Sequence, residues 1–308
     1  MGTYWKNKII AIVGPNASGK TSLSIGICLY LNSKKIKKHF NIKGAEIISA
    51  DSRQVYKGLD IGSGKIKKKE TKGIPHHLID IVSPKKIFTV ADYKKKAIKK
   101  IENLHKENKI PIIVGGTGFY VDAIIKNTTI PEVMPDWKLR KKLEQKTKKE
   151  LFLMLEKKDK RRAKEIDKNN KRRIIRALEI IESTGKRIPK KENNPLFDSL
   201  IFGIKKSQEK QKILIAKRLK KRLREGMVKE VENLHKKGIS WKRLEDLGLE
   251  YRYIAYYLQG KMPYDEMIEK LQKEIEHFAK RQMTWFKRNK EIIWIEGLKE
   301  AKKNLEKI

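Results

Sequence analysis

The stretch Ile9-Ile10-Ala11-Ile12-Val13-Gly14-Pro15-Asn16-Ala17-Ser18-Gly19-Lys20-Thr21 decides the fold of this 308-residue chain. Its apolar, mostly β-branched first part predicts a strand, and the pattern G-x-x-x-x-G-K-T after it predicts a phosphate-binding P-loop that opens a helix. The glycines let successive backbone N–H groups point at one anion, and the helix adds the positive end of its dipole. Lys20 would bring a charge to the distal phosphate, and the Thr21 hydroxyl would face a Mg²⁺ ion. The alternative is an ordinary glycine-rich turn, and the pattern names neither the ligand nor the reaction.

Composition sets the class of protein and of partner. With 39% hydrophobic residues the chain can bury a full core, either as one large domain or as one domain with an inserted module. Lys and Arg number 75 against 37 acidic residues, a net charge of +38. Such an excess favours a polyanionic partner, most commonly nucleic acid, although a general enrichment in lysine would produce part of it.

The single cysteine, Cys28, cannot form an internal disulfide, and no Cys/His set has zinc-ligand spacing. We therefore expect a reduced, cytoplasmic protein without a structural metal. The apolar run before the glycine-rich loop is too short for a signal peptide or a membrane span, so neither is expected.

Two further strands are predicted to end beside the P-loop. Ala45–Ala50 reads as a strand that ends at Asp51, and Pro111–Val114 reads as another that ends in Gly115-Gly116-Thr117. Ligands of open α/β sheets lie past the carboxyl ends of the strands, so Asp51 is expected next to the loop, where it would bind magnesium or accept a proton. A helix N-cap is the alternative for this aspartate. The glycines and threonine stand where a P-loop ATPase commonly has a metal-binding acid, which favours a transferase over a hydrolytic motor.

Between these strands lie a glycine-rich passage at 58–65 and the adjacent pair His76 and His77. Adjacent residues of an extended chain point to opposite sides, so packing or hydrogen bonding is favoured over a shared metal for the pair. Thr89 is the expected N-cap of an amphipathic helix that runs through Leu104.

From about residue 126 the sequence becomes strongly charged and helical. One helical region begins at Asp136, and a second helix follows residues 167–170 and ends at Gly185. Arg172, Arg173 and Arg176 lie opposite the apolar face of this helix, which suits phosphate contacts or a solvated face equally. The strand pattern resumes at 200–204, and one long helix is expected over about 207–236. Basic and aromatic residues at 279–288 fit either RNA binding or, for Trp285 and Phe286, core packing.

Taken together, these motifs resemble the tRNA dimethylallyltransferases, also called tRNA isopentenyltransferases or IPP transferases. The resemblance extends in family order from residue 9 to residue 288. The matching blocks are GPNASGKTSL (14–23), ADSRQVYKGLDIGSGK (50–65), GIPHHLID (73–80), FTVADY (88–93), PIIVGGTGFY (111–120), NKRRIIRALEI (170–180), GMVKEVENL (226–234) and AKRQMTWFKR (279–288).

The resemblance implies a mixed α/β fold: a P-loop NTPase-like parallel-sheet core, 1–125 and 186–308, with an all-helical tRNA-binding insertion at 126–185. It implies transfer of a dimethylallyl group from dimethylallyl diphosphate to N6 of adenosine 37, next to the tRNA anticodon. Residues 14–21 and Mg²⁺, with Thr21 as its ligand, would hold the diphosphate. Asp51 would be the general base, with Thr21 and Arg218 also assigned to catalysis.

The same resemblance assigns residues that contact tRNA. We expect a monomer that binds the anticodon stem-loop of its tRNA and does not bind a membrane. The assigned residues are Asp51, Ser52, Arg53, Gln54, Thr117, Arg140, Arg172, Arg173, Ile174, Ile175, Arg176, Tyr251, Arg252, Lys280, Arg281 and Gln282. The chain departs from the common pattern at Asn16, at 62–66, at Arg172 and at Glu250.

Two other classes share part of these features. A small-molecule or nucleoside kinase would also need the P-loop and Asp51, but it would use ATP and gain nothing from Arg140 or Arg173. A non-catalytic RNA-binding protein would share the basic insertion and tolerate the loss of Asp51.

Overall fold

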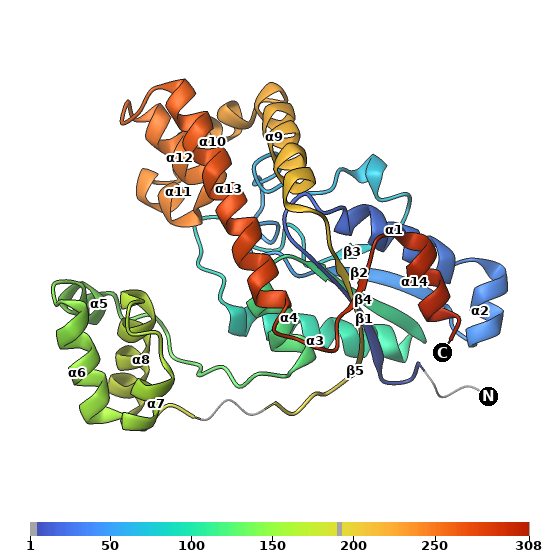
Figure 1. Ribbon diagram of the computed structural model, residues 1–308, viewed down its shortest axis with the longest axis horizontal. Coiled ribbons are helices and arrows are strands. Elements are labelled where there is room, and N and C mark those ends of the chain that lie inside the picture. Colours follow the sequence, from blue (N-terminus) through green and yellow to red (C-terminus); the bar gives the residue numbers. More distant parts are fainter. Residues whose placement is uncertain (1–4, 190–192, 308) are drawn as a thin grey trace. The chain divides into compact units, whose positions relative to one another are not determined.

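The computed structural model describes residues 5–189 and 193–307, which fall into two compact units (Figure 1). One unit comprises Met1–Lys126 and Pro195–Ile308, and the other comprises Asn127–Asn194. The residues at 126 and 185 that the sequence indicated as limits of the insertion enclose all four helices of the second unit.

The first unit is built on a six-stranded parallel sheet with the order β3-β2-β4-β1-β5-β6. The central strands are almost wholly buried, as expected of a parallel sheet covered on both faces. The sequence-based predictions of a mixed α/β fold and of four of these strands are confirmed. The two strands it missed, β3 and β6, are the shortest. The bounds are β1 Lys8–Val13, β2 Gly44–Ser49, β3 His76–His77, β4 Lys109–Gly115, β5 Asp198–Ile204 and β6 Ile293–Ile295.

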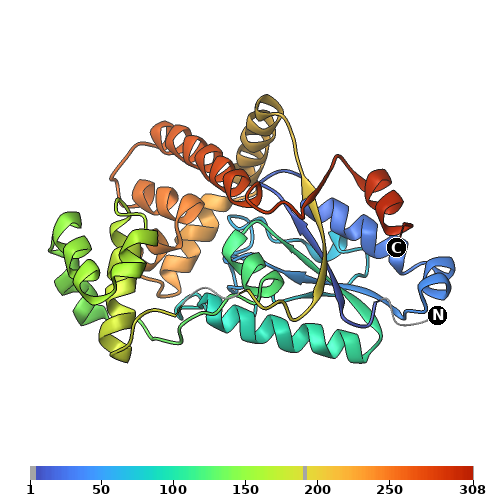
Figure 2. The same ribbon diagram turned by 60° about the horizontal axis from the view of Figure 1, so that its bottom comes forward.

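Alternate residues of the strands point to two separate hydrophobic clusters. Ile10 and Ile12 of β1 belong to the cluster under α1 (Lys20–Leu31), α2 (Lys34–Phe40) and α14 (Leu298–Leu305). Ile9, Ala11 and Val13 belong to the cluster under α3 (Val90–Lys106) and α4 (Gly118–Ile125). Figure 2 shows α3 along its face of the sheet.

The C-terminal helices form a third cluster that also buries Val55, Tyr56 and Leu59 from the segment after β2. The single long helix expected over 207–236 was wrong. Gly226 adopts a left-handed φ of 95° and separates two helices there, a conformation that glycine reaches without a Cβ penalty. The helices are α9 Gln208–Arg224, α10 Met227–Lys236, α11 Trp241–Leu247, α12 Leu249–Leu258 and α13 Tyr264–Phe286. A short 3-10 helix, η1, spans Lys68–Glu70.

The second unit is a small helical module around Leu151, Leu155, Ile174 and Leu178. Two of its helices begin where the sequence indicated, because Asp136 and Asn170 accept backbone N–H groups at their starts, and Gly185 ends the last helix as expected, with φ 63°. The helices are α5 Trp137–Glu144, α6 Lys148–Lys158, α7 Lys160–Glu165 and α8 Lys171–Thr184. In the described parts of both units, no helix is long and apolar enough to cross a membrane.

Thr89 offers a direct test of local stability, because its predicted role as the N-cap of α3 is confirmed. Its hydroxyl oxygen accepts the Asp92 N–H at 3.2 Å, and the Asp92 carboxylate accepts the Thr89 N–H at 2.8 Å. Thr89→Ala should lower the free energy of unfolding by about 1 kcal/mol, measured by urea denaturation, because an N–H at the helix start loses its acceptor. Thr89→Ser, which keeps the acceptor, should change it little. Equal losses in both variants would contradict the capping role.

Candidate functional site

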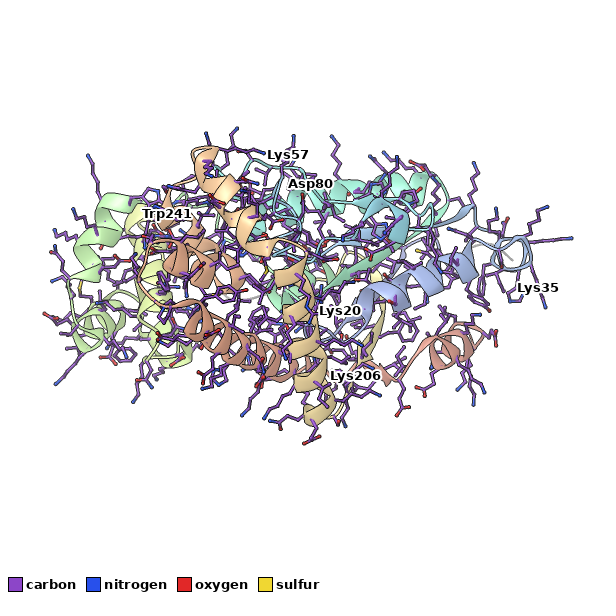
Figure 3. All side chains as sticks on the ribbon, turned by 90° about the horizontal axis from the view of Figure 1, so that it is seen from above. Lys20, Lys35, Lys57, Asp80, Lys206 and Trp241 are labelled. Atoms are coloured by element: carbon purple, nitrogen blue, oxygen red, sulfur yellow. The ribbon has the colours of Figure 1, made fainter. Side chains whose placement is uncertain are left out.

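A pocket lies at the carboxyl ends of β2 and β4 and the start of α1, with about 440 Å³ of space including its open mouth. Its polar lining includes Lys20, Thr21, Asp51, Gln54 and His76. Its apolar walls are Ile47, Ile66, Ile79 and Val114. Lys20, Thr21, Asp51 and Gln54, which were assigned to the site from the sequence, therefore line one cavity, and Figure 3 labels Lys20 at the start of α1.

The glycine-rich loop has the tight backbone that its sequence predicted. Gly14, Ala17 and Gly19 all have positive φ values, of 151°, 59° and 97°. The Lys20 ammonium donates to the Pro15 carbonyl oxygen at 2.7 Å. Burial, together with the nearby charge of Arg218, lowers the pKa of Lys20 to about 7, although Asp51 acts in the opposite direction.

Asp51 caps the turn that follows β2, and it also faces the pocket. One carboxylate oxygen, Oδ1, accepts the backbone N–H groups of Arg53 at 2.8 Å and Gln54 at 3.3 Å. The other oxygen accepts no hydrogen bond from the described residues. The capping role and the chemical role considered from the sequence are therefore compatible, because they use different oxygens.

The residues after Asp51 are tied to neighbouring segments. The Thr117 hydroxyl accepts the Ser52 N–H at 3.1 Å, which joins the loops after β2 and β4. The Arg53 Nε donates to the Leu247 carbonyl at 2.5 Å. The Gln54 side chain donates to the Gly64 carbonyl at 3.4 Å. Of these residues only Gln54 lines the pocket, and the other hydrogen bonds hold the loop that follows Asp51.

Arg218 approaches this region from α9. Its guanidinium donates to the Gly64 carbonyl at 3.5 Å, and burial, together with the charge of Arg222, lowers the pKa of Arg218 to about 10. Since the charge of Arg218 also lowers the pKa of Lys20, these two poorly solvated cations repel each other. An anion between them would relieve their repulsion.

Two glutamines from the C-terminal helices hold the glycine-rich loop. Gln282 is 6% exposed, accepts the Asn16 N–H at 2.8 Å and donates to the Gly116 carbonyl at 2.8 Å. Gln211 donates to the Asn16 carbonyl. The resemblance assigned Gln282 to tRNA, whereas its amide here joins two loops of the pocket. The sequence reasoning missed Gln211, whose signal was a polar residue at helical spacing from the buried Ile215 and Leu219.

The other C-terminal residues assigned to tRNA differ in exposure. Tyr251 is 1% exposed and donates its hydroxyl to Glu230, and Arg252 donates to the Glu245 carbonyl at 2.9 Å. Lys280 and Arg281 are exposed on α13. Core packing accounts for the aromatic residues after them: Phe286 is buried, and Gly118 leaves room for the Trp285 ring.

In the second unit, two arginines pair with the buried Glu179, whereas two others are exposed. Arg140 donates to both oxygens of Glu179 at 2.8 Å, and Arg176 donates to one at 2.5 Å. Burial raises the pKa of Glu179, but these hydrogen bonds outweigh burial and leave the pKa lowered. Arg172 and Arg173 are exposed instead. The expectation that Arg172, Arg173 and Arg176 share one exposed face was therefore wrong for Arg176, which is half-buried.

Ile174 and Ile175, also assigned to tRNA by the resemblance, have buried side chains. They pack in the hydrophobic cluster of the second unit.

The pocket offers oxygen ligands rather than a dedicated metal cage. Thr21 and Asp51 both line it, and the described residues contain no group of three or more His, Cys, Asp or Glu that could hold a metal. This fits Mg²⁺, which commonly keeps waters and binds through one or two protein oxygens plus substrate phosphates. The predicted hydrogen-bonding role of the histidine pair is confirmed, because His76, which lines the pocket, is bonded to the Ile74 carbonyl at 2.8 Å and His77 is bonded to Glu46 at 2.6 Å.

Fold and site together define the class: a mixed α/β protein whose glycine-rich loop and acidic residue share a pocket at the end of a parallel sheet. The chain belongs to the IPP transferase family, because the family model described as IPP transferase matches residues 54–289. It is accordingly a transferase.

Individual relatives agree with this assignment. The chain is 41% identical to tRNA dimethylallyltransferase 1 of Syntrophus aciditrophicus over 94% of this chain and 93% of that protein. It is 39% identical to the tRNA dimethylallyltransferase of Acetivibrio thermocellus, over 94% and 91%.

Solved structures of relatives have the same fold. The tRNA isopentenylpyrophosphate transferase of Bacillus halodurans is similar with a TM-score of 0.68 and 34% identity, over 94% of this chain and 89% of that one. A structure described as eukaryotic dimethylallyltransferase acting on tRNA is similar with a TM-score of 0.73 and 26% identity, over 91% and 69%.

The lowered pKa of Lys20 predicts a pH-dependent affinity for anions. A bound pyrophosphate favours the charged ammonium and raises its pKa, so binding above pH 7 must take up a proton. The affinity of the wild type should therefore fall between pH 7 and pH 9, by up to about tenfold per pH unit. Isothermal titration in two buffers of different ionisation enthalpy measures both the affinity and the proton uptake.

Lys20→Arg is the matched control, because a guanidinium stays charged over this range. The titration of pyrophosphate itself is the same in both proteins. Equal pH dependence in wild type and variant would contradict the assignment to Lys20.

Proposed function

We propose that this protein transfers the dimethylallyl group of dimethylallyl diphosphate to N6 of adenosine 37, beside the anticodon of its tRNA substrates. The observation that carries the proposal is that Lys20, Thr21 and Asp51 line one pocket. This places groups suited to a diphosphate beside a carboxylate suited to proton removal. Membership of the IPP transferase family supports the same reaction.

The loop and two cations suit the leaving group. As the allylic C–O bond breaks, negative charge develops on the diphosphate, and fixed donors stabilise it most when they need not reorganise. The positive-φ loop, the Lys20 ammonium and the Arg218 guanidinium supply such donors. A bound Mg²⁺, held by the Thr21 hydroxyl and substrate oxygens, would neutralise further charge on the diphosphate.

Asp51 suits the acceptor side. The adenine amine is a weak nucleophile, because its lone pair is delocalised into the ring, so it needs placement and loss of a proton. The oxygen of Asp51 that is not used by the turn would accept this proton. The hydrogen bonds to Oδ1 fix the carboxylate and so limit the reorganisation that the transfer requires.

The tRNA would be held mainly through its phosphates, with the target base flipped into the pocket. The exposed Arg172 and Arg173 of the second unit and the exposed Lys280 and Arg281 of α13 suit phosphate contacts. Ser52 and Thr117, joined by a hydrogen bond, suit the entrance for the base. The proposal includes action as a monomer in the cytoplasm, in keeping with a buried free thiol at Cys28.

The first test incubates the purified protein with Mg²⁺, dimethylallyl diphosphate and unmodified tRNA, followed by mass analysis of the digested nucleosides. The wild type should add one dimethylallyl mass to one adenosine. Asp51→Asn keeps an oxygen to cap the turn but removes the base, so it should fold and bind tRNA normally while kcat falls at least about 100-fold. Full activity in Asp51→Asn would contradict its role as the base. Phosphate transfer from ATP to a small acceptor, without prenylation, would favour a kinase instead.

A second test separates RNA contact from structural pairing in the second unit. Arg173→Gln should weaken tRNA binding and reduce the slope of log affinity against log salt by about 1, because one phosphate contact is lost. Lys157→Gln removes the same charge from an exposed site on α6 and should have less effect. Filter binding at several salt concentrations measures both. Equal effects of the two variants would count against a specific contact at Arg173.

A further inference from the structure

Arg218 is oriented by backbone rather than by an acidic side chain. It forms no ion pair within the described part of the chain, and its guanidinium donates to the Gly64 carbonyl. Gln54, which lines the pocket, donates to the same carbonyl. The position of the Gly64 carbonyl therefore affects the orientation of two side chains, Arg218 and the pocket-lining Gln54.

The segment that contains Gly64 is held by Glu230 of α10. One oxygen of this carboxylate accepts the N–H groups of Asp60 at 3.0 Å and Ile61 at 2.6 Å. The other accepts the Gly62 N–H at 3.0 Å and the Tyr251 hydroxyl at 3.1 Å. A carboxylate that accepts three consecutive N–H groups fixes the backbone between them and satisfies donors that would otherwise be left unpaired.

The carbonyl side of the same segment faces α9. Arg222 donates to the Gly62 carbonyl at 3.1 Å and to the buried Glu250 at 3.0 Å. Glycine is needed at both positions for this approach: a Cβ at residue 62 would lie 2.7 Å from the Tyr251 ring, and one at residue 64 would overlap the guanidinium groups of Arg218 and Arg222. The segment is thus held between a carboxylate on its N–H side and two arginines on its carbonyl side.

We propose that Glu230 is a positioning residue for the diphosphate site. By holding residues 60–62, it places the Gly64 carbonyl so that Arg218 is aimed at the leaving group and Gln54 is held in the pocket wall. Glu230 itself touches no substrate. The inference rests on the function proposed above and adds a residue that the resemblance did not assign.

Glu230→Gln is the direct test, because an amide keeps the size of the side chain but turns one acceptor oxygen into a donor that faces the N–H groups of the segment. With inorganic pyrophosphate and Mg²⁺ as the probe, isothermal titration should show about tenfold weaker binding, since charge-assisted bonds to the segment are lost. The KM for dimethylallyl diphosphate should rise, with the affinity for tRNA unchanged. Glu232→Gln is the matched control on the same helix, because Glu232 pairs with the exposed Lys229 and Lys236 and should leave pyrophosphate binding unchanged.

A double variant distinguishes positioning from general loosening. If Glu230 acts through Arg218, adding Glu230→Gln to Arg218→Gln should not weaken pyrophosphate binding beyond Arg218→Gln alone. Tyr251→Phe removes one of the four hydrogen bonds to Glu230, and it should weaken binding by about threefold even if Glu230→Gln fails to fold.

Two results would overturn the positioning role while leaving the proposed function intact. One is wild-type affinity for pyrophosphate in Glu230→Gln. The other is a double variant in which the effects of the two single variants multiply. Unchanged binding in a folded Tyr251→Phe, where Glu230→Gln cannot be purified, would overturn it as well. Absence of pyrophosphate binding in the wild type would overturn the proposed diphosphate site together with this inference.

Discussion

The backbone carbonyl and N–H of Asn16 are hydrogen-bonded to the side chains of Gln211 and Gln282, which lie 195 and 266 residues further along the chain. The rest of the pocket depends on this constraint. A tight loop at the end of a parallel sheet leaves N–H and carbonyl groups that the sheet cannot pair, and buried polar groups must find partners. Gln282 satisfies the loops after β1 and β4 with one amide, so α13 joins the two walls of the pocket. The site is therefore a product of the whole first unit, not of the glycine-rich motif alone.

Acidic side chains compensate some of the arginines of the protein and leave others unpaired. In the second unit, Glu179 compensates Arg140 and Arg176, and the three side chains form a closed structural network. In the first unit, the pKa values of Arg218 and Lys20 are both lowered by burial and by the charges of other cations. Uncompensated positive charge of this kind destabilises the free protein and favours an anionic ligand. Ion pairing thus separates the arginines that stabilise the fold from those available for chemistry.

Much of the fold could be predicted from local patterns, since strands, caps and turns are encoded within a few residues. Thr89, Asp136 and Gly185 mark helix ends as their residue types predict, and the central strands follow from apolar runs. Gly226 is of a residue type that commonly ends a helix, yet a single helix was expected across it. The partners of the candidate site could not be predicted in this way. Gln211, Glu179 and Glu230 act on segments that only the tertiary fold brings to them, and no local pattern distinguishes them from surface residues.

One departure from the family pattern, the glycine at position 64, affects how Arg218 is held. The segment 62–66, where the chain departs from the common pattern, contains Gly64, which has a left-handed φ of 61° and has the ends of two arginines where a Cβ would lie. An alanine there would be strained by its φ and would displace both guanidinium groups. The close approach of Arg218 to the Gly64 carbonyl is therefore available only with glycine at this position. A carbonyl can orient a guanidinium without neutralising it, whereas an acid would cancel the charge that the leaving group needs. The use of backbone to aim Arg218 thus keeps its positive charge available to the substrate.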